Sequence, residues 1–373
     1  MMHKTIPLGE YDAELAYRWT PRKANNWFKK NGWRIGCNYL PSTSINQLEM
    51  WQADTFDPFI MDKELSWAAS LGFNTVRVFL HHLLWEQDAK GFKKRIELFL
   101  AIANKHGIKT MFVLFDAVWD PHPKAGKQPE PKPNIHNSGW VQCPGYSVLN
   151  DPTRYDALYE YVHGIVNHFK HDSRILIWDL YNEPDNMNLT SYKDTEYALH
   201  KAELSLELLK KTIRWVRGIG PDQPITMAPW QNDWSCDLEI SVLDNYMFRH
   251  SDIISFHCYE DKAGTEKRIK ELKRFDRPML CTEYMARPFG STFQEILPIL
   301  KDHNVGAYNW GFVQGKSQTH CPWDSWEKKY ENEPDMWFHD IFRTDGTPYN
   351  SAEVEFLKEF LHREPEAPVK KVA

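Results

Sequence analysis

The strongest constraint on the fold is an alternation of eight short apolar segments with amphipathic helical segments. The apolar segments, each predicted to be a strand, begin near residues 33, 75, 110, 175, 225, 253, 279 and 306. Apolar strands separated by helices are typical of a parallel sheet that helices cover. An open doubly wound sheet is the rival, but no glycine-rich phosphate-binding motif follows the first strands. The sequence therefore predicts an α/β fold, a single (β/α)8 TIM barrel.

The predicted loops are strongly unequal in length on the two sides of the sheet. Connections from a helix to the next strand are short, whereas residues 117–150 and 313–349 form long connections after strands three and eight. In barrels, the loops after the strands assemble the active site. We expect residues 33–363 to form the barrel with long βα loops 3 and 8, residues 1–32 an N-terminal extension packed on it, and residues 364–373 a flexible tail.

Charge and composition exclude several classes of protein. The formal net charge is -6 and no basic run is present, so neither a nucleic-acid partner nor membrane insertion is expected. Six scattered cysteines without a C-x-x-C pair predict neither a zinc site nor a disulfide framework. We expect a soluble protein, cytoplasmic as the sequence stands, and periplasmic or secreted if a native signal peptide was removed. The oligomeric state is left open.

Polar side chains at the ends of apolar strands are the candidate site residues, because burying them without a function is costly. They are Arg77, His81, Asp116, Asn182, Glu183, His257, Tyr259, Glu283 and Trp310. His81 and His82 are adjacent on a predicted strand, so at most one lines the site and the two cannot chelate one metal. No H-x-H motif occurs, and we expect neither a metal nor an organic cofactor.

Two carboxylates that converge from strands four and seven suit glycosidic cleavage with retention. One protonates the departing oxygen and the other attacks the anomeric carbon, at a carboxyl separation of about 5 Å. Their pKa values must differ, and Arg77 and Tyr259 are candidates to keep Glu283 ionised. The structural alternatives are a capped turn at Glu183 and a buried ion pair between Glu283 and Arg77.

The strings WDLYNEP at residues 178–184 and TEY at residues 282–284 resemble clan A glycoside hydrolases, especially the cellulase-like family 5. Arg77, the H-x-Y spacing of residues 257–259 and Trp310 extend the resemblance. It implies that Glu183 is the acid/base, Glu283 the nucleophile, Asn182 a ligand of the sugar 2-hydroxyl and Trp310 the floor of subsite -1, with Arg77, His257 and Tyr259 supporting the carboxylates. Asp116 departs from the family, which usually has a histidine there, and His81 and His82 are possible substitutes.

The leading hypothesis is a retaining β-glycoside hydrolase that acts by double displacement on an oligosaccharide or polysaccharide, such as β-mannan, β-glucan or a related glycan. The alternatives are a non-catalytic carbohydrate-binding barrel and a transglycosylase with the same catalytic pair. Long loops 3 and 8 would either wall off a pocket or flank an open cleft, and such insertions favour a pocket. The loop tryptophans are candidates for further sugar contacts: Trp119, Trp140, Trp230, Trp234, Trp323 and Trp326.

Overall fold

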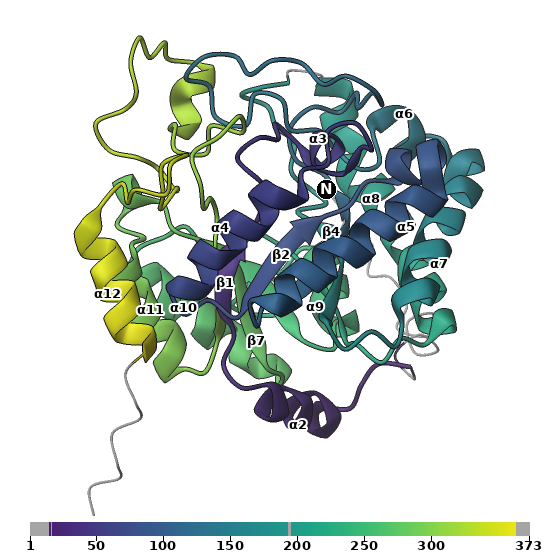
Figure 1. Cartoon of the computed structure of the whole chain (residues 1–373). Coiled ribbons are helices and arrows are strands. Elements are labelled where there is room, and N and C mark those ends of the chain that lie inside the picture. The colour runs from purple at the N-terminus through teal and green to yellow at the C-terminus, as the bar shows by residue number, and fades with distance from the viewer. Residues whose placement is uncertain (1–14, 16, 193–194, 363–373) are drawn as a thin grey trace, which may run out of the picture.

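The computed structural model describes residues 15, 17–192 and 195–362. Eight parallel strands form one sheet in the order β5-β4-β3-β2-β1-β8-β7-β6, and this sheet curls into a barrel (Figure 1). Backbone hydrogen bonds such as the one from His257 N to Pro229 O, 3.1 Å, join the two outer strands. The predicted TIM barrel is confirmed. The strands are β1 (Ile35–Asn38), β2 (Thr75–Phe79), β3 (Lys109–Asp116), β4 (Ile175–Asn182), β5 (Ile225–Ala228), β6 (Ile254–His257), β7 (Met279–Tyr284) and β8 (Gly306–Asn309).

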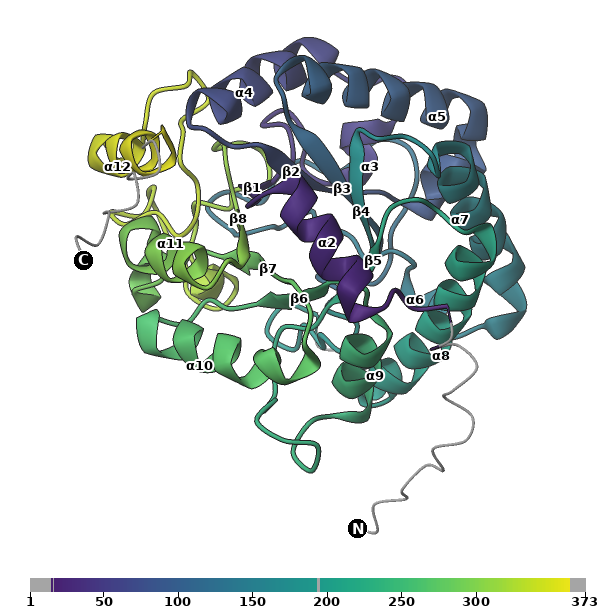
Figure 2. The ribbon, with the colours of Figure 1, turned by 90° about the horizontal axis from the view of Figure 1, so that it is seen from below.

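A ring of helices surrounds the barrel (Figure 2). Each buries one face against the strands; in α7, for example, Leu158, Val162 and Ile165 lie three or four positions apart and are all buried. The helices of the ring are α4 (Pro58–Ser70), α5 (His82–Lys105), α7 (Tyr155–Phe169), α8 (Thr195–Ile219), α9 (Val242–His250), α10 (Lys262–Leu272), α11 (Phe293–Asp302) and α12 (Ser351–His362).

The short helix α2 (Pro21–Asn31) crosses the N-terminal end of the barrel (Figure 2). The Thr20 side chain caps it by accepting a hydrogen bond from Lys23 N, 3.2 Å. Trp19 and Phe28 pack in one buried cluster with side chains of the barrel strands, among them Ile177. This end is therefore filled with apolar side chains. The predicted tail, residues 364–373, lies outside the described residues.

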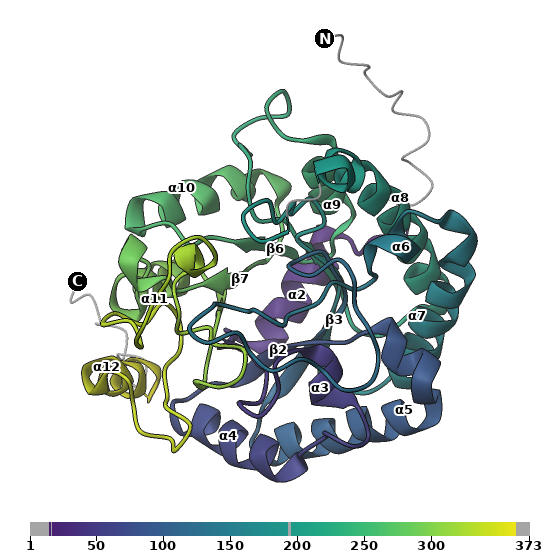
Figure 3. The same cartoon turned by 90° about the horizontal axis from the view of Figure 1, so that it is seen from above.

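The opposite end of the barrel carries the long connections (Figure 3). The loop after β3 and the loop after β8 are both on this face, as predicted. Short helical segments interrupt these connections: α3 (Gln47–Trp51), α6 (Tyr146–Leu149) and the 3-10 turns η2 (Pro152–Arg154), η4 (Arg287–Phe289) and η5 (Trp323–Trp326). A further 3-10 turn, η3 (Lys273–Phe275), lies between α10 and β7. Among the described helices, none is long and apolar enough to span a bilayer.

Candidate active site

Glu183 and Glu283 meet at the C-terminal end of the barrel. Glu183 directly follows β4, and Glu283 lies near the end of β7. A carboxylate oxygen of each lies within 4.8 Å of the other, and both lie within this distance of a ring nitrogen of His257. Both side chains line a cavity of about 240 Å³. The short separation matches retaining glycosidases, whose carboxyl groups stand about 5 Å apart, rather than inverting ones, which leave room for a water.

Arg77, on β2, donates hydrogen bonds to side chains of three other strands beneath the carboxylates. Its Nη1 donates to Glu283 Oε1 and to Asn38 Oδ1, each at 2.9 Å, and its Nη2 donates to Asn182 Oδ1 at 2.6 Å. Its Nε donates to Asp179 Oδ2 at 2.9 Å. Arg77 is fully buried, and although burial opposes its charge, Asp179 and Glu283 raise its pKa. A permanent positive charge therefore lies directly beside Glu283.

Glu283 is surrounded by hydrogen-bond donors. Besides Arg77, the Tyr259 hydroxyl donates to its Oε2 at 2.6 Å, and His257 Nδ1 lies 3.5 Å from the same oxygen. Burial raises the pKa of Glu283, while His257, Arg77 and Tyr259 oppose this rise. Donors to both oxygens favour the ionised form, which is the state a nucleophile requires.

Glu183 has a different set of neighbours. His257 Nδ1 donates to its Oε1 at 2.6 Å and Asn186 Nδ2 to its Oε2 at 2.7 Å. Burial raises its pKa to about 7, opposed by the Asn186 hydrogen bond and reinforced by Asp185. Burial also lowers the pKa of His257 to about 3, so its ring is neutral. Glu183 therefore carries a proton over much of the neutral range, as a general acid must.

Asp116 lies behind the cavity wall. Its Oδ1 accepts from Asn182 Nδ2 at 2.9 Å and its Oδ2 from Trp140 Nε1 at 2.6 Å. It is 1% exposed and is not among the residues that line the cavity, whereas Asn182 and Trp140 are. The structure thus places Asp116 as a support for two lining side chains, and not in the position to touch sugar that the sequence suggested.

The prediction that His81 and His82 lie on a strand is wrong. Strand β2 ends at Phe79, so His81 caps α5 and His82 is its first residue. Their rings stack with centroids 4.9 Å apart instead of facing opposite ways, and with Cys143 they present three possible ligand atoms within 4.8 Å. His81 is fully buried, bonded to Gln142 O and Leu83 N, and does not line the cavity.

Tryptophan rings form much of the cavity surface. The lining set includes Trp310, as predicted, with Trp119, Trp140, Trp230 and Trp323 from the loops. Trp326 stands behind Trp119, with ring centroids 5.7 Å apart and an interplanar angle of 14°. Trp234 is fully buried and donates to Asp244 Oδ2 at 3.0 Å, so it packs its own loop.

Several residues of the site were not identified from the sequence. Asp179 had a usable signal, because an acidic residue interrupts the apolar strand β4. Asn38, at the end of β1, had a weaker signal of the same kind. His136 and Asn186 line the cavity from loops, where no periodic pattern predicts the direction of a side chain.

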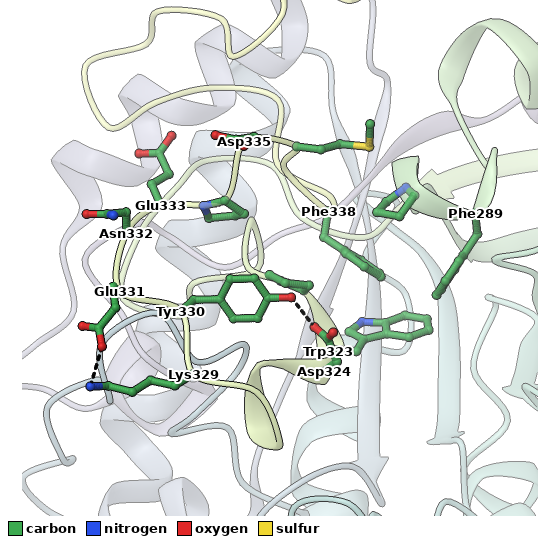
Figure 4. Close-up of a pocket in the computed structure, with 14 residues that line it drawn as sticks. Phe289, Trp323, Asp324, Lys329, Tyr330, Glu331, Asn332, Glu333, Asp335 and Phe338 are labelled. Atoms are coloured by element: carbon green, nitrogen blue, oxygen red, sulfur yellow. Dashed lines mark hydrogen bonds and ion pairs between the residues drawn. The ribbon is translucent and has the colours of Figure 1, made fainter.

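A larger cavity, about 670 Å³, lies between the loop after β8 and the segment that follows β7 (Figure 4). Phe289, Trp323, Tyr330 and Phe338 contribute aromatic surface to it. Its charged groups are partly paired: Lys329 Nζ lies 2.6 Å from Glu331, and the Tyr330 hydroxyl donates to Asp324 at 2.8 Å. It shares Trp323 with the smaller cavity but contains neither catalytic candidate.

Solved glycosidase structures share this fold. An endo-1,4-β-D-mannanase from Thermotoga petrophila has a TM-score of 0.55 and 14% identity, covering 88% of this chain and 99% of its own. An exo-β-1,4-mannosidase from an Opitutaceae bacterium has a TM-score of 0.55 and 18% identity, and the match covers 88% of this chain and 59% of the mannosidase. A Bacteroides uniformis β-glucuronidase has a TM-score of 0.55 and 13% identity, and the match covers 88% of this chain and 35% of the glucuronidase. No curated protein matches the chain in sequence.

Family membership follows from the sequence model rather than from these distant structures. Residues 40–329, most of the chain, match the model described as cellulase (glycosyl hydrolase family 5). The matched region contains both glutamates, Arg77 and Trp310. The chain belongs to glycosyl hydrolase family 5 and is a retaining glycoside hydrolase of clan A.

Proposed function

We propose that this protein hydrolyses a β-linked glycan or oligosaccharide by double displacement, with Glu283 as nucleophile and Glu183 as acid/base. The observation that carries the proposal is the pair of carboxylates within 4.8 Å in unlike surroundings. Glu283 accepts from an arginine and a tyrosine, whereas Glu183 accepts from a neutral histidine and an amide. Two carboxyl groups whose environments separate their pKa values are the requirement for acid and nucleophile roles.

In the first step Glu283 attacks the anomeric carbon while Glu183 gives its proton to the leaving oxygen, so the glycosidic bond breaks and a glycosyl ester forms. In the second step the now ionised Glu183 takes a proton from water, and the water oxygen displaces Glu283. Asn182 is held by Arg77 and Asp116 and is the proposed partner of the sugar 2-hydroxyl. Trp310 is the proposed floor beneath the ring.

The cavity favours an uncharged sugar. Among the described residues that line it, none is lysine or arginine, and the only acidic groups are Glu183 and Glu283. Burial lowers the pKa of the lining residue His136 to about 3, so this ring is neutral. A uronate carboxylate would therefore enter without a cation and beside two acids, which disfavours binding. We propose a neutral β-hexoside or β-pentoside, with β-mannan and β-glucan oligosaccharides as first candidates.

The test is an assay of wild type and two variants on aryl β-glycosides. Glu283→Ala should abolish turnover, because no covalent intermediate can form. Glu183→Ala should keep its first step on an activated leaving group, and azide should restore turnover by giving a β-glycosyl azide. Wild-type turnover by Glu283→Ala, or a product of inverted configuration by NMR, would contradict the proposal.

A further inference from the structure

We propose that the enzyme acts from the chain end and releases one neutral monosaccharide at a time from the non-reducing terminus. This inference rests on the function proposed above and adds its mode of attack. It depends on a contact between the two long loops, which we name the loop bridge and define as residues 132–137 of the loop after β3 against residues 317–330 of the loop after β8.

Hydrogen bonds fasten the loop bridge along its whole length. Asn137 N donates to Ser317 O at 2.8 Å. His136 contributes through its ring and its carbonyl: Nδ1 donates to Cys321 O at 2.9 Å, and the carbonyl accepts from Trp326 Nε1 at 2.8 Å. The Gln318 amide accepts from Asn134 N at 2.8 Å and donates to Lys132 O and Ile135 O at 2.7 and 3.0 Å. Such a contact forms a fixed wall rather than two independent loops.

We assign the part of the loop bridge that contacts Trp140 and Trp310 to the side of the cavity where the glycone would bind. Trp310, the proposed platform of that ring, packs against Trp140 with centroids 5.6 Å apart. Trp140 N donates to Asn137 O at 3.1 Å, and Ser317 lies beside both indoles. A glycone whose anomeric carbon lies between the carboxylates and whose ring lies over Trp310 points its far end at this wall. A sugar attached to that end would have to pass Trp140 or the loop bridge.

Behind Trp140 and Trp310, the described residues enclose a small void of about 20 Å³. It is lined by both indoles, by Leu40 and by Ser317 and Thr319 of the loop after β8. A volume of this size holds about one water and no sugar ring. The catalytic cavity itself, about 240 Å³, lies below the usual ligand-pocket range of roughly 300–1,000 Å³. It therefore suits a single terminal sugar better than an internal stretch of polymer.

The remaining part of the cavity lies on the side of the acid/base. Asn186, Asn188 and Thr190 follow Glu183 in the loop after β4, and Trp230 follows β5 and donates to Asp185 Oδ1 at 3.0 Å. Since Glu183 protonates the leaving oxygen, the rest of the glycan extends along these residues. The geometry thus combines a closed glycone side with an extended leaving-group side.

The experiment uses the sugar whose aryl β-glycoside the full-length protein hydrolyses. Its β-1,4-linked tetrasaccharide, labelled at the reducing end, should give free monosaccharide and labelled trisaccharide first, then labelled disaccharide. The same tetrasaccharide with a 4-O-benzyl group on its non-reducing residue should react at least about 100-fold more slowly than the unblocked one, because the glycone no longer fits. Disaccharide as a first product, or cleavage of the blocked and unblocked substrates at equal rates, would overturn the inference. Activity on the aryl glycoside would in that case still support the proposed function.

A variant tests the loop bridge as the cause. Gln318→Ala removes the hydrogen bonds of the Gln318 amide without altering a cavity-lining residue, so kcat on the aryl glycoside should stay near wild type while a disaccharide product appears. The control is Asn332→Ala, an exposed position of the same loop outside the loop bridge, which should retain the wild-type products. If Gln318→Ala and wild type give identical products, the loop bridge is not what limits the cavity.

Discussion

Glu183 and Glu283 carry the same functional group, and their neighbours make them different. Arg77 and Tyr259 donate to Glu283 from strands and strand ends, where the backbone holds them still. Glu183 instead depends on His257 and on Asn186, a loop residue three positions further along the chain. Glu183 also has a φ of 43°, a left-handed conformation that non-glycine residues rarely adopt and that clusters at functional sites.

Asn186→Ala should raise the pKa of Glu183 above its present value of about 7. The amide donates to the ionised carboxylate, so its removal favours the protonated form. A hydrogen bond to a charged group contributes about 1.5 kcal/mol, which corresponds to roughly one pH unit. The basic limb of the pH profile of kcat/KM should therefore move to higher pH by about one unit, measured on an aryl β-glycoside.

The acid limb of the same profile is the internal control for Asn186→Ala. It reports ionisation of Glu283, which Asn186 does not contact, so it should not move. A basic limb that stays in place or moves to lower pH would show that Asn186 does not set the proton affinity of Glu183.

At the scale of the elements, irregular strand pairing positions the site. The register of β4 with β5 shifts between Asp179 and Asn182, that of β6 with β7 at His257, and that of β7 with β8 between Cys281 and Tyr284. Such irregularities re-aim side chains and are common next to active sites. These register shifts lie beside Glu183 and Glu283, and they help to direct the two side chains toward the C-terminal end of the barrel.

Helix α8 supports the site through a buried lysine. Lys201 is fully buried, and its ammonium group donates to Ala117 O in the loop after β3 and to Asn186 O in the loop after β4. Burial lowers the pKa of Lys201 to about 7. The two carbonyls belong to the loops that carry Trp119 and Asn188, both of which line the cavity. One side chain of the helix ring thus holds two active-site loops together.

Lys201→Met should therefore lower both stability and activity. The methionine leaves one buried and one partly buried carbonyl without this donor, which should cost about 1–3 kcal/mol in the free energy of unfolding, measured with urea. Looser loops should raise KM on oligosaccharides more than on aryl glycosides. Lys210→Met, on the more exposed side of the same helix, should change stability by no more than about 0.5 kcal/mol. Equal effects of the two variants would argue against a positioning role for Lys201.

Across the whole molecule, buried ionisable groups of opposite type balance one another. Burial raises the pKa of one set of carboxyl groups to about 6 or about 7 and lowers the pKa of a set of histidines to about 4 or less. The carboxyl groups are Glu64, Asp116, Asp179, Glu183, Asp244 and Asp340. The histidines are His81, His136, His257 and His320. Burial also lowers the pKa of His82 and His339 well below its ordinary value, so each set has six members in the described part of the chain.

The free energy of unfolding should consequently change little between about pH 4.5 and pH 6. In that range the folded chain holds extra protons on the carboxyl groups and the unfolded chain holds extra protons on the histidines, so the two slopes oppose each other. As the pH falls below about 4, these carboxyl groups become protonated in the unfolded chain as well, so their opposing slope disappears while that of the histidines remains. Stability should then fall steeply with decreasing pH, by up to about 1.4 kcal/mol per histidine per pH unit.

Urea unfolding at a series of pH values, followed by tryptophan fluorescence, checks this expectation. A midpoint that remains constant down to pH 3 would show that the buried histidines do not resist protonation in the folded state. A midpoint that rises steadily from pH 4.5 to 6 would show that the histidines outweigh the carboxyl groups throughout.

Local sequence patterns were enough to predict the barrel and the position of its chemical centre. Strand and helix periods are local properties of the chain, so eight apolar segments between amphipathic ones suffice to predict the alternation. The parallel arrangement then brings strand ends together, which is why Arg77, Asn182, Glu183, Glu283 and Trp310 could be predicted to lie near one another, as they do in the structure. Asp116 and His81 were misplaced, because a strand end predicts the neighbourhood of a side chain but not whether another loop covers it.

The enclosure of that centre depends on contacts between distant segments, which local patterns do not predict. The loop bridge pairs residues 132–137 with residues 317–330, far apart in the chain, through side-chain and backbone hydrogen bonds that follow no sequence period. The same holds for which loop tryptophans face the cavity and for the pKa of Glu183, since both depend on burial by distant segments. Local periodicity specifies elements, whereas the shape and polarity of a cavity depend on contacts between loops that periodicity does not encode.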